Sequence, residues 1–70
     1  MKVTKTIIER NEGQNEHGCK ITNELVKIET NCTKEYVWYK TINDHKCIVC
    51  SYKTEKRMRK AMADCGFYKI

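Results

Sequence analysis

Residues 35–66 read EYVWYKTINDHKCIVCSYKTEKRMRKAMADCG, and this segment carries the strongest structural signals in the chain. Its first eight residues are aromatic and β-branched, the tetrapeptide NDHK at 43–46 is typical of a turn, and residues 47–52 return as a second strand. Thr54 suits a helix N-cap, Glu55 suits the positive end of a helix dipole, and Gly66 is a natural stop. The segment therefore predicts a β-hairpin followed by a helix that ends near Cys65.

A hairpin loop at Asp44 and His45 would decide which side chains share a face of the sheet. In that register Tyr39 faces Cys50 and Val37 faces Tyr52. One predicted face holds Val37, Tyr39, Thr41, Ile48, Cys50 and Tyr52, and the other holds Tyr36, Trp38, Lys40, Cys47, Val49 and Lys53. We expect the helix to cover the first face, so the second must be solvated, covered by the N-terminal segment or buried in a partner.

The predicted helix is amphipathic. Its apolar stripe, at spacings of three and four residues, consists of Met58, Ala61, Met62 and Cys65. The opposite side carries Lys53, Lys56, Arg57 and Lys60. We expect the apolar stripe to pack on the sheet.

The remaining sequence adds strands. Residues 3–10 are predicted as a strand and residues 11–18 as an exposed loop. Residues 19–30 favour a bulged strand, with a short helix opened by Thr22 or Asn23 as the alternative. Residues 67–70 could add a short edge strand. We thus predict one α+β domain over residues 1–70, with an antiparallel sheet of three to five strands and one C-terminal helix packed on one face.

The formal net charge of +5 is unevenly distributed. Residues 1–35 carry six basic and six acidic side chains, whereas residues 36–70 carry eight basic and three acidic ones. Such an asymmetry points to an anionic partner, either nucleic acid or an acidic protein face.

No apolar run approaches the roughly 18 residues of a membrane span, and no signal-peptide core follows the N-terminus, so we expect a cytoplasmic protein with no membrane contact.

The five cysteines and two histidines raise the question of metal or catalytic chemistry. His17 and Cys19 are close in sequence, as are His45, Cys47 and Cys50, and zinc prefers four such ligands. In a regular strand, however, Cys47 and Cys50 would point to opposite faces, so we expect free cysteines and treat a zinc module as an alternative. A thioredoxin-type Cys-x-x-Cys needs a helix N-terminus, which this pair lacks. No nucleophile and base are held together, so we expect no enzyme and no cofactor.

Cations and aromatic side chains supply the predicted partner-binding surface. Trp38 is expected in the core on balance, which leaves Tyr36 as the more exposed aromatic, although both could stack on bases or anchor an interface. The candidate binding residues are Tyr36, Trp38, Lys40, Lys53, Lys56, Arg57, Arg59 and Lys60.

The order of strand, turn, strand and then Thr54-Glu55 opening a helix is similar to small sheet-plus-helix DNA-binding modules such as the arm-binding domains of phage integrases. The likeness covers residues 35–66 only. The glycines and arginines usual in the strands of those modules are absent here. The resemblance implies that a DNA-binding role has to be considered.

We therefore expect a non-catalytic binding protein that acts by stoichiometric occlusion of a larger host protein or nucleoprotein complex. A phage or mobile-element inhibitor of a host defence complex, of the anti-CRISPR kind, is one such role. The alternatives are a small basic DNA- or RNA-binding protein and a small zinc-binding module. A homodimer is compatible with each of them, because pairing would cover the free sheet face.

Overall fold

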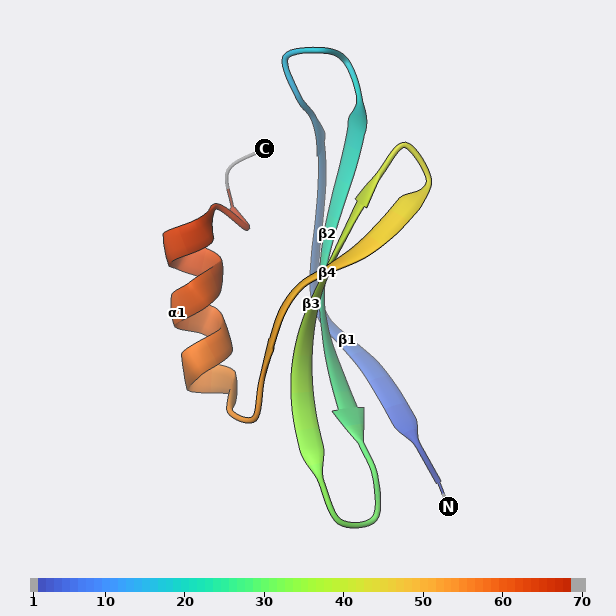
Figure 1. Cartoon of the computed structure of the whole chain (residues 1–70), viewed down its shortest axis with the longest axis vertical. Coiled ribbons are helices and arrows are strands. Elements are labelled where there is room, and N and C mark those ends of the chain that lie inside the picture. Colours follow the sequence, from blue (N-terminus) through green and yellow to red (C-terminus); the bar gives the residue numbers. More distant parts are fainter. Residues whose placement is uncertain (1, 69–70) are drawn as a thin grey trace.

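The structure is a computed structural model that describes residues 2–68, and it confirms the predicted α+β class (Figure 1). Four strands form one antiparallel sheet in the order of the chain: β1 (Thr4–Gln14), β2 (Lys20–Glu29), β3 (Lys34–Ile42) and β4 (His45–Tyr52). The helix α1 (Glu55–Cys65) follows directly. None of the described helical structure is long and apolar enough to cross a membrane.

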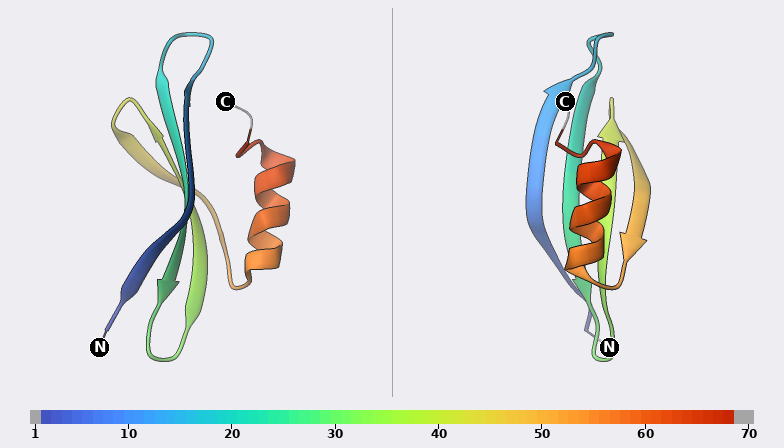
Figure 2. Two further views of the ribbon diagram at one scale, coloured as in Figure 1. Left: turned by 180° about the vertical axis from the view of Figure 1, so that it is seen from behind. Right: turned by 90° about the vertical axis from the view of Figure 1, so that its left-hand side faces the viewer.

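The helix lies along one side of the sheet and leaves the other side uncovered (Figure 2). The main core cluster lies in the layer between α1 and the sheet. Its buried members are Leu25, Tyr36, Trp38, Met58, Met62 and Phe67. The rings of Trp38 and Phe67 meet edge to face, with centroids 5.4 Å apart, an arrangement that aromatic pairs favour.

The predicted hairpin is confirmed, but its register is not. Asn43 and Asp44 form the two-residue turn, and both have positive φ (46° and 72°), as a type I′ turn requires. Sequence analysis placed this loop one residue too late, at Asp44 and His45. Asn and Asp are among the few non-glycine residues that adopt the left-handed conformation routinely, because their short polar side chains can form local hydrogen bonds, and both therefore suit this turn.

A β-bulge in β4 changes which side chains reach the helix. Tyr39 pairs with Ile48 but Trp38 pairs with Cys50, so Val49 is the extra residue. Beyond the bulge Cys50 and Tyr52 therefore lie on the Trp38 side, whereas we predicted them on the Tyr39 side. As a result, α1 packs on the face that bears Tyr36 and Trp38, the opposite of the prediction.

The N-terminal hairpin is longer than predicted. β1 continues through residues 11–14, predicted as loop, because these residues pair with residues 20–23 of β2. The chain then turns at 15–19, where the Asn15 side chain accepts hydrogen bonds from the backbone of His17 and Cys19, each at 2.9 Å. Residues 20–29 form a strand, so the alternative of a short helix was wrong. The bulge expected there lies instead in β1, at Ile8.

The ends of α1 are confirmed as predicted. Thr54 is the N-cap, and its hydroxyl accepts a hydrogen bond from the Arg57 backbone. Gly66 is in the left-handed region (φ 89°) and its N–H bonds to the Met62 carbonyl. Phe67 then turns back into the core, so it is not part of an edge strand, and residues 69–70 lie outside the described part.

Candidate binding face

The face of the sheet that points away from α1 is the candidate functional surface, and we call it the open face. Side chains alternate along each strand, so the pairing of the strands assigns every position to one face. The open face carries, row by row, Lys5, Ile28 and Glu35; Ile7, Val26, Val37 and Ser51; Arg10, Glu24, Tyr39 and Ile48; Glu12, Thr22, Thr41 and Lys46. This face has an apolar middle with charged residues around it.

The apolar middle is only partly shielded. Val26 and Val37, on the two central strands, are buried although neither belongs to the cluster under the helix. Since no helix or loop lies over this side in Figure 2, side chains of neighbouring strands must cover them. The flanking Ile7 and Ile48, on the two edge strands, are 57% and 62% exposed. The open face thus presents aliphatic side chains to solvent from both edges of the sheet.

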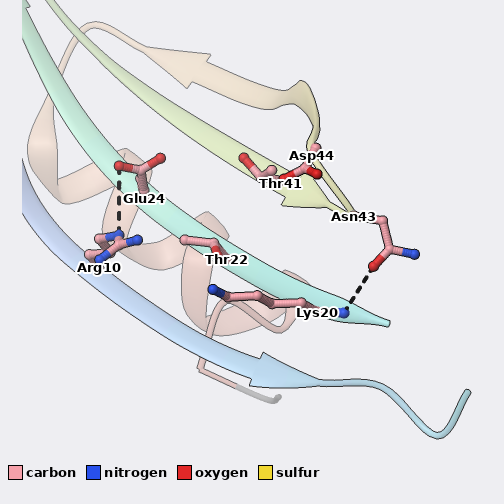
Figure 3. A pocket seen from close by; sticks show the side chains of 7 residues that line it. All are labelled: Arg10, Lys20, Thr22, Glu24, Thr41, Asn43 and Asp44. Carbon is pink, nitrogen blue, oxygen red and sulfur yellow. Dashed lines mark hydrogen bonds and ion pairs between the residues drawn. The ribbon is translucent and has the colours of Figure 1, made fainter. Parts of the chain in front are cut away.

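Two adjoining hollows lie on this face, and Glu24 lines both of them. The first, which we call the apolar hollow, has a volume of about 430 Å³ and is lined by Lys5, Ile7, Glu24, Val26, Tyr39 and Lys46. The second, the polar hollow, has a volume of about 410 Å³ and is lined by Arg10, Lys20, Thr22, Glu24, Thr41, Asn43 and Asp44 (Figure 3). Together they form a trough that follows β2.

The charges of the polar hollow are largely matched. Arg10 pairs with Glu12 at 2.7 Å and with Glu24 at 3.9 Å, the contact drawn in Figure 3. Lys20 lies 3.9 Å from Glu12, and its backbone N–H donates to the Asn43 side chain. Both cations at this end of the trough therefore have acidic partners.

The apolar hollow differs, because its two lysines have no carboxylate partner within residues 2–68. Lys46 instead places its ammonium 4.5 Å from the centroid of the Tyr39 ring, a cation–π contact. Lys5 lines the same hollow from β1. Two unmatched cations therefore stand beside an apolar and aromatic surface.

The predicted aromatic part of the binding surface is not available. Tyr36 is 7% exposed and Trp38 is 1% exposed, and both pack beneath α1. The Trp38 indole N–H donates to the Asn23 side chain at 3.0 Å, so its polar atom is satisfied internally. The expectation that Tyr36 is an exposed aromatic was wrong, because α1 covers this face. The half-buried aromatic of the open face is Tyr39, which sequence analysis placed in the core.

The predicted basic residues separate into two groups. Lys53, Lys56, Arg57 and Lys60 are exposed, and none has an ion pair within the described residues. Lys40 lies on the helix side of β3, opposite Cys47 and apart from this group. Arg59 instead donates to Glu9 at 2.8 Å and to Glu55 at 3.1 Å. These bonds hold the pKa of Arg59 above its usual value and that of Glu9 below its own, so Arg59 has a structural role.

The bulge in β4 also overturns the geometric argument about Cys47 and Cys50. Cys47 pairs with Lys40 and Cys50 with Trp38, so both cysteines lie on the helix side of the sheet. Even so, no three His, Cys, Asp or Glu residues among positions 2–68 are close enough to hold a metal ion. All five cysteines are free thiols.

Sequence analysis missed the open face because its residues come from all four strands. The alternation of Thr22, Glu24, Val26 and Ile28 indicated one face of a strand, but no local pattern indicated the register that sets Ile7 beside Val26 and Ile48 beside Tyr39. Comparison of the chain with protein-family models, with curated proteins and with solved structures finds no match. Function therefore has to be inferred from the geometry of the chain itself.

Proposed function

We propose that this protein is a non-catalytic binding protein that docks its open face on a larger macromolecule and acts by occluding it in a one-to-one complex. The observation that carries the proposal is the exposure of Ile7 and Ile48 on either side of buried Val26 and Val37. Removing apolar surface from water stabilises a complex by a free energy of roughly 25 cal/mol for each Å² buried. A contiguous apolar patch rimmed by polar residues marks an interaction site.

The charge balance of the open face favours a protein as the partner. Its basic residues are offset by an equal number of acidic ones: Lys5, Arg10, Lys20 and Lys46 against Glu12, Glu24, Glu35 and Asp44. A phosphate backbone laid on this face would meet four carboxylates, and most of its attraction to the cations would be cancelled. A protein interface with an apolar centre and a mixed polar rim has no such conflict.

Occlusion of a host protein or nucleoprotein complex is the form of this function that we favour. A chain of 70 residues offers one broad face and little enclosed volume, which suits steric blocking of a larger target. An inhibitor of a host defence complex, carried by a phage or mobile element as anti-CRISPR proteins are, would act in this way.

The test is a comparison of two charge insertions at exposed apolar positions. Ile48→Asp introduces a carboxylate on the open face, and Ala63→Asp introduces the same group on the exposed side of α1. We expect affinity capture from host cells with mass spectrometry to recover the same partner with the wild type and with Ala63→Asp, and to lose it with Ile48→Asp. Thermal melts and NMR spectra establish that both variants are folded.

Retention of the partner by a folded Ile48→Asp variant would contradict the proposal. Light scattering on the purified protein tests whether the open face binds a second copy of this chain. If the partner on the open face is a second copy of this chain, the wild type is a dimer and Ile48→Asp is a monomer.

The exposed basic stripe of α1 supports nucleic-acid binding as a second candidate function. Lys56, Arg57 and Lys60 lie on one side of α1 at spacings of three and four residues, Lys53 lies just before the Thr54 N-cap, and none of the four has an acidic partner among the described residues. Each phosphate that such a stripe neutralises would contribute about 0.9 to the slope of log affinity against log salt concentration.

A gel-shift titration at two salt concentrations tests this candidate. The variant Lys56→Gln/Arg57→Gln removes two charges from the stripe, and Lys2→Gln/Lys34→Gln removes two exposed charges that belong neither to the stripe nor to the hollows. Nucleic-acid binding by the stripe predicts a weaker affinity and a shallower salt dependence for the first variant only. Equal losses in both variants would instead indicate non-specific attraction to net charge.

A further inference from the structure

We infer that the apolar hollow recognises a large apolar side chain that is accompanied by a carboxylate, so that the partner presents an acidic, hydrophobic segment to the open face. This inference rests on the proposed function, since it assigns a chemical class to the partner of the same face.

The lining of the hollow supplies the apolar part of the recognition. Val26, at its base on β2, is buried, whereas Ile7 on β1 is more than half exposed. Tyr39 on β3 adds an aromatic ring. The volume of about 430 Å³ falls in the range of roughly 300–1,000 Å³ that is usual for ligand pockets. One large aliphatic or aromatic side chain can bury its surface there.

The charges at the hollow supply the polar part. Lys5 and Lys46 both line it, and neither has a carboxylate partner within residues 2–68. Glu24 is the one acidic residue of the lining, and its carboxylate lies 3.9 Å from the Arg10 guanidinium. The cation–π contact with Tyr39 holds the Lys46 ammonium beside the aromatic ring. A carboxylate next to the bound apolar group would therefore meet an excess of positive charge.

The acidic residues around the hollow favour an anion that is confined to the hollow over a polyanion that extends along the trough. Glu35 lies in the same row as Lys5, two strands away on β3, and Glu12 and Asp44 lie towards the turn of β3 and β4. A polyanion extended along the trough would pass over these carboxylates. A protein segment with one or two acidic residues near an apolar anchor avoids them, which is why we favour an acidic protein segment over a nucleic acid.

Three probes that share one phenylpropyl carbon skeleton and carry an anionic, a neutral or a cationic head group can test the inference. They are 3-phenylpropionate, 3-phenylpropionamide and 3-phenylpropylammonium, titrated into the isotopically labelled full chain and followed by ¹H–¹⁵N NMR. We expect the largest shifts at the amides of Ile7, Val26 and Tyr39. The carboxylate should bind about fivefold more tightly than the amide, the size of one favourable ion pair near a surface, and the ammonium most weakly.

Two matched variants connect this preference to the lysines. Lys5→Gln/Lys46→Gln should remove the preference for the carboxylate while leaving binding of the neutral amide unchanged. Lys2→Gln/Lys34→Gln, which removes two exposed lysines outside both hollows and outside the basic stripe, should leave the preference intact. All four substitutions replace exposed lysines, and thermal melts of the variants serve to check that the fold is kept.

Several results would overturn the inference. These are shifts centred outside the hollow, an ammonium probe that binds as well as the carboxylate, and a preference that survives in Lys5→Gln/Lys46→Gln. A single-stranded oligonucleotide that shifts the same amides more strongly than the carboxylate would reassign the hollow to nucleic acid. Ile48 does not line the hollow, so the capture experiment with Ile48→Asp is independent, and the proposed function can stand when this inference fails.

Discussion

Asn23 is the polar residue on which the core layer depends. Its side chain is 1% exposed and connects three parts of the chain. It accepts from the Trp38 indole at 3.0 Å and donates to the Phe67 carbonyl, which also accepts from Asn11 at 2.9 Å. A buried polar group that loses its partner costs about 1–3 kcal/mol. This single amide thus holds the tryptophan in place and fixes the turn after α1 against the sheet.

We expect Asn23→Ala to lower the free energy of unfolding by about 2 kcal/mol, because the indole N–H loses its acceptor inside the core. Urea denaturation measures the change. Asn31→Ala, at an exposed position in the loop between β2 and β3, is the matched control and should stay within about 0.5 kcal/mol of the wild type. Equal stability of the two variants would show that the Asn23 hydrogen bonds contribute little.

Cys50 should be the least reactive of the β4 thiols. Burial raises the pKa of the Cys50 thiol, and the nearby Cys65 raises it further, so less thiolate is present at a given pH. Cys47, three residues earlier, is exposed. We expect timed alkylation with iodoacetamide at pH 8, read by peptide mass spectrometry, to modify Cys47 well before Cys50. Similar rates at the two thiols would mean that β4 or α1 opens on the timescale of the reaction.

At the scale of elements, the sequence was sufficient wherever local chemistry determines the outcome. The Thr54 cap, the Gly66 stop, the Met58/Met62 stripe and the existence of the β3–β4 hairpin all follow from residues close together in the chain, although the turn itself was predicted one residue too late. The two bulges, at Ile8 and Val49, do not. A bulge leaves one residue unpaired, and its cost is recovered by packing with segments far away in the sequence.

The bulge at Val49 is also what made the site hard to predict. Without it, Cys50 and Tyr52 would share a face with Tyr39, and the helix would be expected there. With it, these two residues join Trp38, and Tyr39 is left on the open face. A shift of one residue in β4 therefore exchanged the predicted core face with the predicted binding face.

The N-cap of α1 makes a modest contribution to the stability of the helix. The Thr54 hydroxyl accepts from the Arg57 backbone at 3.4 Å, a long bond, so its contribution falls towards the lower end of the range for N-caps. We expect Thr54→Ala to lower the free energy of unfolding by about 0.5–1 kcal/mol in urea denaturation. Thr54→Ser keeps the hydroxyl and should restore most of the loss. A Ser variant as unstable as the Ala variant would implicate the Thr methyl group instead.

At the scale of the whole molecule, the two surfaces have different chemistry and point in different directions. The molecule measures 42 × 24 × 15 Å, so it is thin, and α1 separates the core layer from the basic stripe. The excess charge of the C-terminal half lies largely on this stripe, while the open face is balanced. Proteins that bind a nucleoprotein could use both, but each surface can be disabled without touching the other, as the variants above do.

The ion pair between Arg59 and Glu9 ties α1 to the edge strand β1, and it makes stability depend on pH. The hydrogen bond from Arg59 lowers the pKa of Glu9 below its usual value near 4.5. A carboxyl group with a depressed pKa in the folded state stabilises the fold above its unfolded pKa, and this stabilisation is lost as the pH falls through the folded pKa. The pair should thus contribute fully at pH 6–7 and disappear in acid.

We expect Glu9→Gln to be less stable than the wild type at pH 7 by up to about 1 kcal/mol, since both side chains are partly exposed. The difference should shrink below pH 4.5 and vanish once Glu9 is protonated in the folded wild type. Urea denaturation between pH 7 and pH 2.5 measures it, and Glu35→Gln, which removes a carboxylate without an ion pair among the described residues, should show no such trend. A deficit for Glu9→Gln that stays constant across this range would mean that the Gln side chain disturbs the local structure of β1 and that the charge of Glu9 does not contribute to stability.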